Sequence, residues 1–359
     1  MLETDPSLPT ATRDDGEARG RLGARLCASG RVEEALAVFE RSLERHPSAA
    51  AWNNKGTCLI ALGRASEALP CFEHALALEA GFPFAWLNKA AALAEAGREM
   101  EALTCLQNAT QADARLARPC LAIAGAWLRS GRHALAAGWY EVALRAQPGD
   151  ADAWHNRGVT LRALGRHAEA LASYERALQL EPQNADAWFN KGNALDDMGR
   201  PEEALACYER CLSIQPADAA AWLNHGLSLR HLGREADAIA SFDRVLAIDA
   251  NFSAAWTCRG EALVRLERHA EALASFERAL ETGAPLARAW AGKAEALSSL
   301  GRHEEALACY DTALDADPEY AEAWLGKGKS LQQLGDKKEA RRCFARATAL
   351  DPALSRQLK

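Results

Sequence analysis

Tryptophan recurs through this chain at intervals of 34 residues, and this spacing constrains the fold more than any other feature. The tryptophans in register are Trp52, Trp86, Trp154, Trp188, Trp222, Trp256, Trp290 and Trp324. One interval is 68 residues long, and Cys120 stands at its midpoint. A fixed period of this length is typical of a chain built from supersecondary units that each pack on their neighbours.

Two further positions show how many units there are. With the tryptophan numbered as the fourth residue, the twentieth place is alanine ten times and the twenty-fourth is aromatic in nine of ten units. The sequence therefore predicts ten repeats over residues 16–354, between a disordered tail at 1–15 and a short tail at 355–359. The predicted repeats are 16–48, 49–82, 83–116, 117–150, 151–184, 185–218, 219–252, 253–286, 287–320 and 321–354.

Each unit is predicted to contain two helices, A and B. Alanine and leucine dominate the sequence, and both favour helices over strands. The fifteenth place is glycine in nine units, where helix A has to end with positive φ, and Glu267 is the exception. Asp150, Asn184 and Asp218 precede helix A and suit N-caps. Glycine at the eighth place, as in Gly56, is interpreted as space that lets helix A approach the small alanine of helix B.

This pattern resembles the tetratricopeptide repeat (TPR) family over residues 16–354. The resemblance implies an all-α fold, a right-handed α-solenoid or superhelix of tandem helix-turn-helix repeats. It also implies that helix A lines a concave groove in which a protein or peptide partner binds. We therefore expect a non-catalytic interaction scaffold or adaptor.

Asparagine recurs at the sixth place of helix A, and it forms the first part of the predicted peptide-binding site. Its members are Asn54, Asn88, Asn156, Asn190 and Asn224. The row resembles the asparagines of the TPR superhelix in O-linked N-acetylglucosamine transferase, which grip the backbone of extended peptides. An amide both donates and accepts hydrogen bonds, so it suits a peptide unit. The alternative is that these amides bond only within the scaffold. The row stops at Cys258, Gly292 and Gly326.

The character of the predicted groove changes along the chain. Phe84, Leu87 and Leu121 make its first part apolar, whereas Phe189 is followed by the acidic pair Asp196 and Asp197. We expect an extended partner segment along the second to seventh repeats. Its apolar residues would lie beside the first set, and a lysine or arginine would lie beside the acidic pair.

Lysine or arginine follows the asparagine place in most repeats, for example Lys55 and Lys89. We interpret these side chains as aliphatic stems that cover apolar surface while their charged ends reach water. The third and fourth repeats depart most from the pattern, and two extra tryptophans, Trp127 and Trp139, lie in the fourth. Compensated packing, a soft joint and a second binding face around Trp139 are the alternatives. Polar Arg341 and Thr348 in the last repeat indicate the end of the array.

No constellation for chemistry is evident in the sequence. Four histidines, His133, His167, His269 and His303, follow helix turns and do not converge. Cys207 and Cys211 lie one helical turn apart without a second pair of ligands, and neighbouring cysteines of the repeat are too far apart for disulfides. We therefore predict no catalytic residues, no metal and no cofactor.

The formal net charge of −7 argues against a nucleic-acid partner. The 35-residue period and basic groove of RNA-binding helical repeats are missing as well. No apolar stretch reaches the length of a membrane span, and the first residues do not form a secretion leader. We expect a cytoplasmic monomer without a membrane partner. The alternative function is that of a substrate-positioning or regulatory subunit of a separate enzyme.

Overall fold

The computed structural model describes residues 13–283 and 286–358, and this part of the chain is all α-helical. It contains twenty α-helices and two short 3-10 helices, and no strand lies within the described residues. The chain divides into two compact units, residues 1–182 and 183–359, here called unit 1 and unit 2. Most of the expected N-terminal tail and the last residue of the expected C-terminal tail lie outside the described residues.

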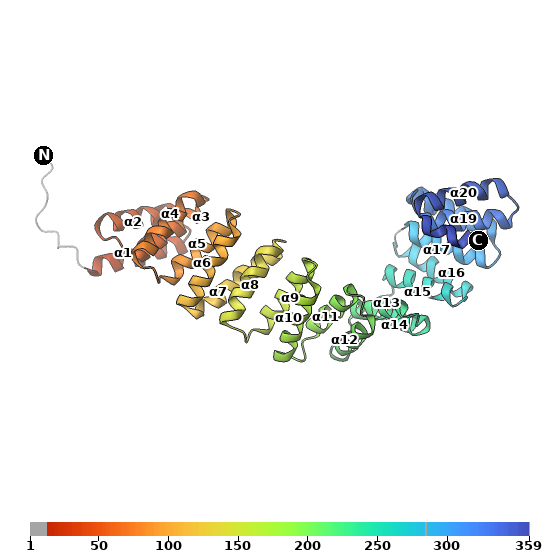
Figure 1. The fold of residues 1–359 in the computed structure, drawn as a ribbon, viewed down its shortest axis with the longest axis horizontal. Helices are drawn as coiled ribbons and strands as arrows, with labels where there is room; N and C mark the ends of the chain where they lie inside the picture. The colour runs from red at the N-terminus through yellow and green to blue at the C-terminus, as the bar shows by residue number, and fades with distance from the viewer. Residues whose placement is uncertain (1–12, 284–285, 359) are drawn as a thin grey trace, which may run out of the picture. The chain divides into compact units, whose positions relative to one another are not determined.

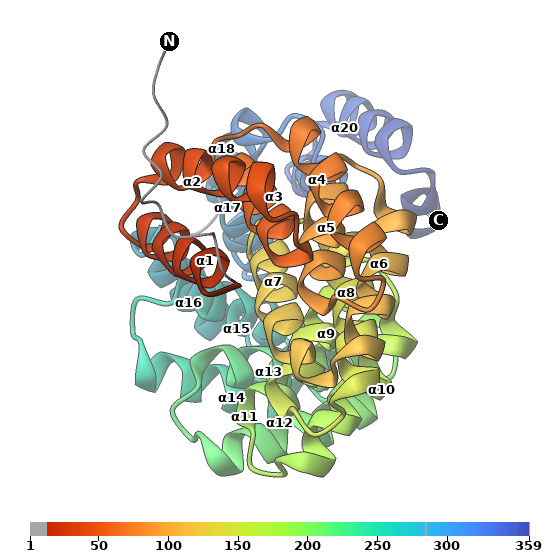
Figure 2. The ribbon, with the colours of Figure 1, turned by 90° about the vertical axis from the view of Figure 1, so that its left-hand side faces the viewer.

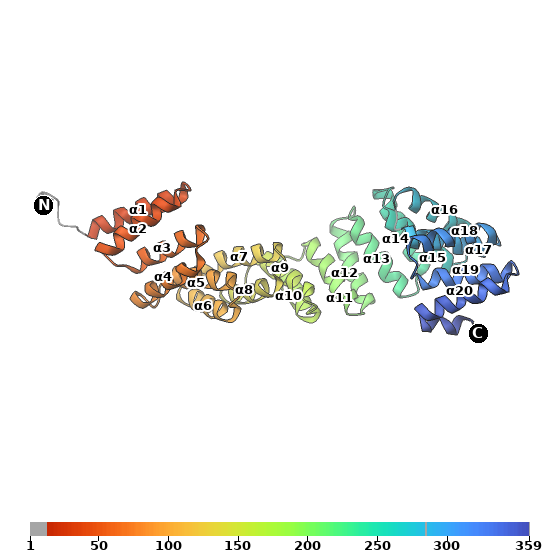
Figure 3. The same ribbon diagram turned by 90° about the horizontal axis from the view of Figure 1, so that it is seen from above.

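Unit 1 consists of five antiparallel helix pairs that follow one another in chain order, as Figures 1 and 3 show. Its elements are α1 (Arg13–Ala28), α2 (Val32–Arg45), α3 (Ala49–Ala61), α4 (Ala65–Leu78), α5 (Pro83–Glu95), α6 (Glu99–Ala112), η1 (Ala114–Leu116), α7 (Ala117–Arg129), α8 (His133–Ala146), α9 (Ala151–Ala163) and α10 (His167–Leu180).

Unit 2 repeats the same plan with five further pairs. Its elements are α11 (Ala185–Asp197), α12 (Pro201–Ile214), α13 (Ala219–His231), α14 (Glu235–Ile248), α15 (Ser253–Arg265), α16 (His269–Glu281), α17 (Leu286–Ser299), α18 (His303–Ala316), α19 (Ala321–Gln333), α20 (Lys337–Leu350) and η2 (Pro352–Leu358). Helix A of each repeat is thus odd-numbered and helix B even-numbered. The prediction of an all-α solenoid of helix-turn-helix repeats is confirmed.

The predicted turn and cap residues end and begin the helices as expected. The glycine of the A–B turn has positive φ in each of its nine repeats, for example +72° at Gly165. Glu267 adopts φ 59°, and the Arg268 N–H still donates to the Leu263 carbonyl at 2.9 Å, as in the glycine turns. This turn therefore keeps its shape, and the glutamate bears the left-handed strain. The Asp150 side chain accepts from the Ala153 N–H at 2.8 Å and caps α9.

The eighth-place glycine has a different partner from the one expected. A Cβ on Gly56 would lie 2.6 Å from the Phe72 ring, and one on Gly158 would lie 2.5 Å from the Tyr174 ring. Glycine is therefore needed at this place to accommodate the aromatic side chain of helix B, and not to let helix A approach the small alanine. The repeat tryptophan has a further role, because the Trp154 Nε1 donates to the Pro148 carbonyl at 2.9 Å and holds the preceding loop.

Packing changes at the third and fourth repeats. The helix B pair α6 and α8 lie directly against one another, as Figure 2 shows, whereas the helix A pair α5 and α7 are packed less closely than the other consecutive A helices of unit 1. A Cβ on Gly138 would lie 2.7 Å from Leu103, so glycine permits the close approach. Trp139 is fully buried in the core that these repeats share. Trp139 itself therefore offers no surface to a partner, and the continuous core favours the packing interpretation.

Candidate functional site

A hollow of about 460 Å³ opens on the helix A side of unit 1. We call it the apolar hollow, since alanine, isoleucine and aromatic side chains form most of its surface. It is lined by Thr57, Ile60, Phe72, Asn88, Ala91, Ala92, Glu95, Ile123, Ala126, Trp127 and Ser130. Helices α3, α5 and α7 supply all of these except Phe72, which comes from α4, and Ser130, which follows the end of α7. The wider separation of α5 from α7 provides the space.

Trp127 forms one wall of the apolar hollow. It is 9% exposed, and the Arg132 guanidinium lies 4.8 Å from its ring centroid. Its indole Nε1 has no hydrogen-bond partner within the described residues. The sequence signalled this residue only as an extra tryptophan in an irregular repeat, and it did not indicate that the ring lines a hollow.

Asn88 connects the predicted asparagine row to the apolar hollow. Its Nδ2 donates to the Asn53 Oδ1 at 2.9 Å and lies 3.3 Å from the Thr57 Oγ1. The amide nitrogen is thus engaged by the preceding repeat, while no donor within the described residues reaches its Oδ1. The Nδ2 of Asn88 therefore braces the scaffold, as one alternative from the sequence supposed. Its Oδ1 remains an open hydrogen-bond acceptor.

The remaining predicted residues of unit 1 differ in exposure. Asn54 and Asn156 are half-buried on α3 and α9, and the Asn156 side chain makes no hydrogen bond in the part of the chain that the structure describes. Phe84 is 51% exposed at the start of α5. Leu87 is buried in the core, and Leu121 is half-buried against that core, so these two offer a partner less surface than Phe84 does.

In unit 2 the predicted residues lie on α11 and α13. Asn224 Nδ2 donates to the Asn193 Oδ1 at 2.8 Å, which repeats the bracing of Asn88. Asn190 and Phe189 are half-buried on α11, and Phe189 lies 6.0 Å from the Tyr208 ring.

The acidic pair does not act as one group. Asp196 lies 2.8 Å from the Tyr208 hydroxyl and accepts from the Ser228 hydroxyl, also at 2.8 Å. Burial raises the pKa of Asp196, although these two hydrogen bonds oppose the rise. Asp196 therefore braces α11 against α12 and α13, whereas Asp197 is exposed. The two carboxylates do not share one environment.

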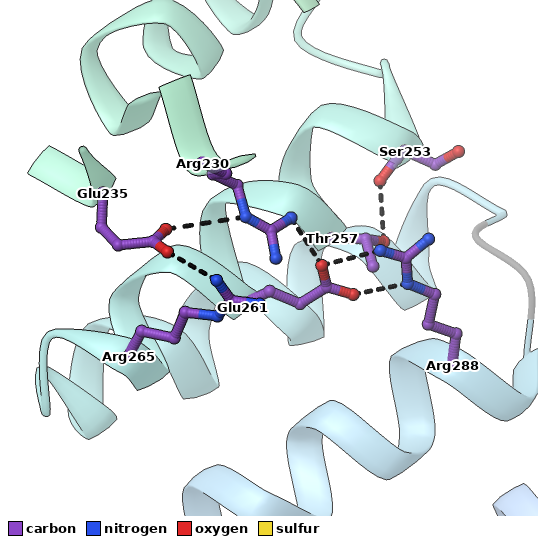
Figure 4. Close-up of polar contacts among 7 residues, drawn as sticks. All are labelled: Arg230, Glu235, Ser253, Thr257, Glu261, Arg265 and Arg288. Carbon is purple, nitrogen blue, oxygen red and sulfur yellow. Dashed lines mark hydrogen bonds and ion pairs between the residues drawn. The ribbon is translucent and has the colours of Figure 1, made fainter. Parts of the chain in front are cut away.

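A network of charged side chains connects α13, α14, α15 and α17 of unit 2 around the buried Glu235 and the half-buried Arg230 and Glu261 (Figure 4). Arg230 Nη1 donates to Glu261 Oε2 at 2.7 Å, and its Nε lies 3.6 Å from Glu235 Oε2. Arg288 donates to Glu261 through Nε at 2.5 Å and Nη2 at 2.7 Å. Arg265 Nη1 donates to Glu235 Oε1 at 2.8 Å. The sequence did not indicate this network.

A second hollow, of about 370 Å³, lies on the helix A side of the last three repeats. We call it the charged hollow. It is lined by Glu261, Arg288, Ala291, Gly292, Glu295, Ser298, Ser299, Tyr310, Tyr320, Glu322, Leu325, Gly326, Lys329 and Leu354. Most of these residues occupy the inward places of helix A. The repeat pattern in the sequence could therefore have indicated them as lining residues. The end of the asparagine row at Gly292 and Gly326 marks the same location.

The charged ends of the basic row at the seventh place are ion-paired, whereas the sequence interpretation had them reach water. Lys89 Nζ is 3.0 Å from Glu73, and Lys55 is 3.1 Å from Glu40 and 5.7 Å from the Trp52 ring centroid. These cations are thus paired with acids on the preceding helix B. Among the described residues, no group of three or more histidine, cysteine or acidic side chains is arranged to hold a metal. None of the described helices combines the length and the apolar character of a membrane span.

Comparisons with known proteins identify the family. Profiles described as tetratricopeptide repeat match residues 21–83, 149–217, 189–251, 257–321 and 293–355, which together make up more than half of the chain. The chain therefore belongs to the tetratricopeptide repeat family, whose members are generally non-catalytic and bind other proteins. No curated protein matches it as a relative.

Solved structures agree on the fold. PilW, a type IV pilus biogenesis factor, is 22% identical, with 58% of this chain and 98% of PilW covered at a TM-score of 0.51. PilF of Pseudomonas aeruginosa is 19% identical, with 58% and 95% covered at a TM-score of 0.50. One chain of the APC/C hetero-tetramer Cut9–Hcn1 is 12% identical, with 95% of this chain and 94% of that chain covered at a TM-score of 0.50. At these identities the likeness extends to the fold alone.

Proposed function

We propose that this protein is a non-catalytic scaffold that holds a partner protein on the helix A side of its repeats. In unit 1, an apolar side chain of an extended partner segment enters the apolar hollow, and the segment's backbone lies against the asparagine row. The observation that carries the proposal is the apolar hollow itself, with Trp127 as its wall and Asn88 on its lining.

The chemistry of the hollow supports this occupant. Its apolar lining favours burial of a hydrocarbon side chain at about 25 cal/mol per Å² of surface removed from water. The Asn88 Oδ1 can accept from a partner backbone N–H while its Nδ2 remains bonded to Asn53. A partially buried aromatic wall beside a polar rim is the usual composition of a peptide anchor site.

Site-specific photo-crosslinking in the native cell tests the proposal. A photoreactive residue in place of Ala126, which is exposed on the hollow, is expected to capture a specific partner. Ile60→Glu is then expected to reduce that capture at least tenfold, because Ile60 is 38% exposed and lines the hollow. A carboxylate there would have to be desolvated against an apolar partner side chain.

Leu78→Glu is the matched control. Leu78 is 55% exposed at the end of α4 and does not line the hollow, so its replacement is expected to leave capture unchanged. Equal capture by the wild type and the Ile60 variant would rule out the apolar hollow as the binding site. Capture of an enzyme together with its substrate would favour the alternative function of a substrate-positioning subunit.

A further inference from the structure

The floor of the charged hollow exists because two repeats have glycine at the place where five others have asparagine. A Cβ on Gly326 would lie 2.2 Å from the Tyr310 hydroxyl oxygen, and a Cβ on Gly292 would lie 2.4 Å from the Phe276 ring. Neither position therefore accommodates a side chain. The glycines let aromatic residues of the preceding helix B reach the helix A side of unit 2.

Tyr310 presents an unsatisfied hydroxyl to the hollow. The residue is 3% exposed and lines the hollow, yet its hydroxyl has no hydrogen-bond partner within the described residues. Burial raises the pKa of Tyr310, and the nearby charge of Glu295 adds to the rise, so the hydroxyl stays protonated. Its oxygen lines the hollow, where it can accept a hydrogen bond from a bound donor.

The open charges around the hollow are predominantly acidic. Arg288 and Glu261 already neutralise one another through two hydrogen bonds. Glu295, Glu322 and Lys329 make no ion pair within the described residues, which leaves two carboxylates against one ammonium. Partial removal from water raises the pKa of Glu295, while Lys329 opposes that rise. Glu295 is exposed on the hollow and makes no ion pair within the described residues, so its carboxylate is open to a cation of the partner.

We infer that the charged hollow binds the side chain of a lysine in the partner protein. The lysine ammonium lies between the Glu295 carboxylate and the Tyr310 hydroxyl. The hydroxyl oxygen accepts a hydrogen bond from one of the three ammonium hydrogens. The aliphatic stem passes over Gly292, Gly326 and Ala291, where small residues leave room. Charge complementarity selects this occupant over an anionic one, because Lys329 is the one base of the hollow that is not paired.

This inference rests on the proposed function for its partner, but its test does not need that partner. Nuclear magnetic resonance of the full chain, with labelled glycine, follows the amides of Gly292 and Gly326 during titration with short peptides. The blocked peptide Gly-Gly-Lys-Gly-Gly is expected to shift both amides with saturation. The same peptide with norleucine, which keeps the stem and lacks the ammonium, is expected to bind at least tenfold more weakly.

Two isosteric variants identify the groups that bind the ammonium. Glu295→Gln is expected to weaken binding of the lysine peptide at least fivefold. Tyr310→Phe is expected to weaken it about twofold to fivefold, and phenylalanine is compatible with the fold because Phe276 and Phe344 occupy the equivalent place. Glu304→Gln, an exposed α18 residue outside the hollow, is the matched control and is expected to bind as the wild type does.

The outcomes separate this site from the proposed function. Equal shifts with lysine and norleucine, an unchanged Glu295→Gln variant, or tighter binding of a glutamate peptide would each overturn the lysine site. If the lysine peptide binds as expected but no partner is cross-linked at the apolar hollow, the proposed function fails and the lysine site stands.

Discussion

The apolar hollow of unit 1 and the charged hollow of unit 2 lie on the same side of the same kind of helix pair, but they differ in chemistry. In unit 1 the hollow follows from a wider separation of α5 and α7, and Asn88 still occupies the sixth place. In unit 2 the helices keep their packing, and the hollow follows from the missing side chains of Gly292 and Gly326. One repeat architecture thus produces a hollow in two ways, by wider helix spacing and by glycine in place of a larger side chain.

The units also differ in how polar groups hold them together. Most carboxylates of unit 1 with lowered pKa values lie in exposed pairs such as Glu67 with Arg64, whose side chains are 54% and 47% exposed, and exposed pairs contribute little stability. Unit 2 contains the buried network around Glu261 and Glu235. The largest expected effect therefore comes from this network. Glu261→Ala leaves Arg230, whose side chain is 11% exposed, without its closest partner and is expected to destabilise unit 2 by about 3 kcal/mol.

Hydrogen exchange measured by mass spectrometry checks this prediction, because it resolves the two units. Faster exchange is expected in α13, α15 and α17 of the variant, with α1–α6 unchanged. Glu67→Ala in unit 1 is the matched control and is expected to have little effect. A loss of protection that is equal in both units would contradict the contrast drawn between them.

The pH dependence of the stability of unit 2 tests the same network without a mutation. Burial acts to raise the pKa of Glu261, but the hydrogen bonds and charge of Arg288, with the charge of Arg230, outweigh it and leave the pKa lowered. A lowered carboxyl pKa contributes stability that is complete above the unfolded pKa of about 4.3 and is lost as the pH falls through the folded value. Unit 2 is thus expected to lose this contribution below pH ~4, and the Glu261→Ala variant is expected to lack it.

The glycine at the sixth place gives the second effect. Gly326→Asn introduces the residue that five repeats have at this place, but its Cβ would overlap the Tyr310 hydroxyl at 2.2 Å. Overpacking of this kind is expected to cost about 2 kcal/mol, measured by chemical denaturation. Gly125→Asn is the control within helix α7, since the nearest atoms to its added Cβ are at 3.5 Å. Equal costs at the two positions would show that the hollow floor does not depend on glycine.

The asparagine row gives a third, smaller contrast. Asn88→Ala removes the hydrogen bond to Asn53 and is expected to destabilise the chain by about 1 kcal/mol. Asn156→Ala removes no hydrogen bond within the described residues and is expected to change stability by much less. Thermal melting of the two variants measures the difference. If both variants melt as the wild type does, the bracing role of Asn88 is wrong.

The smallest expected effect is at the exceptional turn of unit 2. Glu267 has φ 59°, whereas the corresponding turns have glycine. Glu267→Gly relieves the left-handed strain, partly offset by the greater freedom of glycine in the unfolded chain. A net gain of about 0.5 kcal/mol is expected from denaturation curves. A loss of stability would indicate that the glutamate side chain makes a compensating contact.

The sequence by itself determined the parts of this protein that depend on local chemistry repeated ten times. The period of the tryptophans, the turn glycines and caps such as Asp150 each act within one repeat, so the helices and their order were predictable. The family and its general mode of action followed from the same register.

Tertiary structure decided which of the inward residues face open space and which are already engaged. Asp196 was predicted as a contact for a basic partner residue, and the fold surrounds it with the hydroxyls of Tyr208 and Ser228. The apolar hollow depends on the approach of α6 to α8 at Gly138, and the charged network joins residues from four helices. These outcomes are set by distances between repeats, which a pattern within each repeat does not contain.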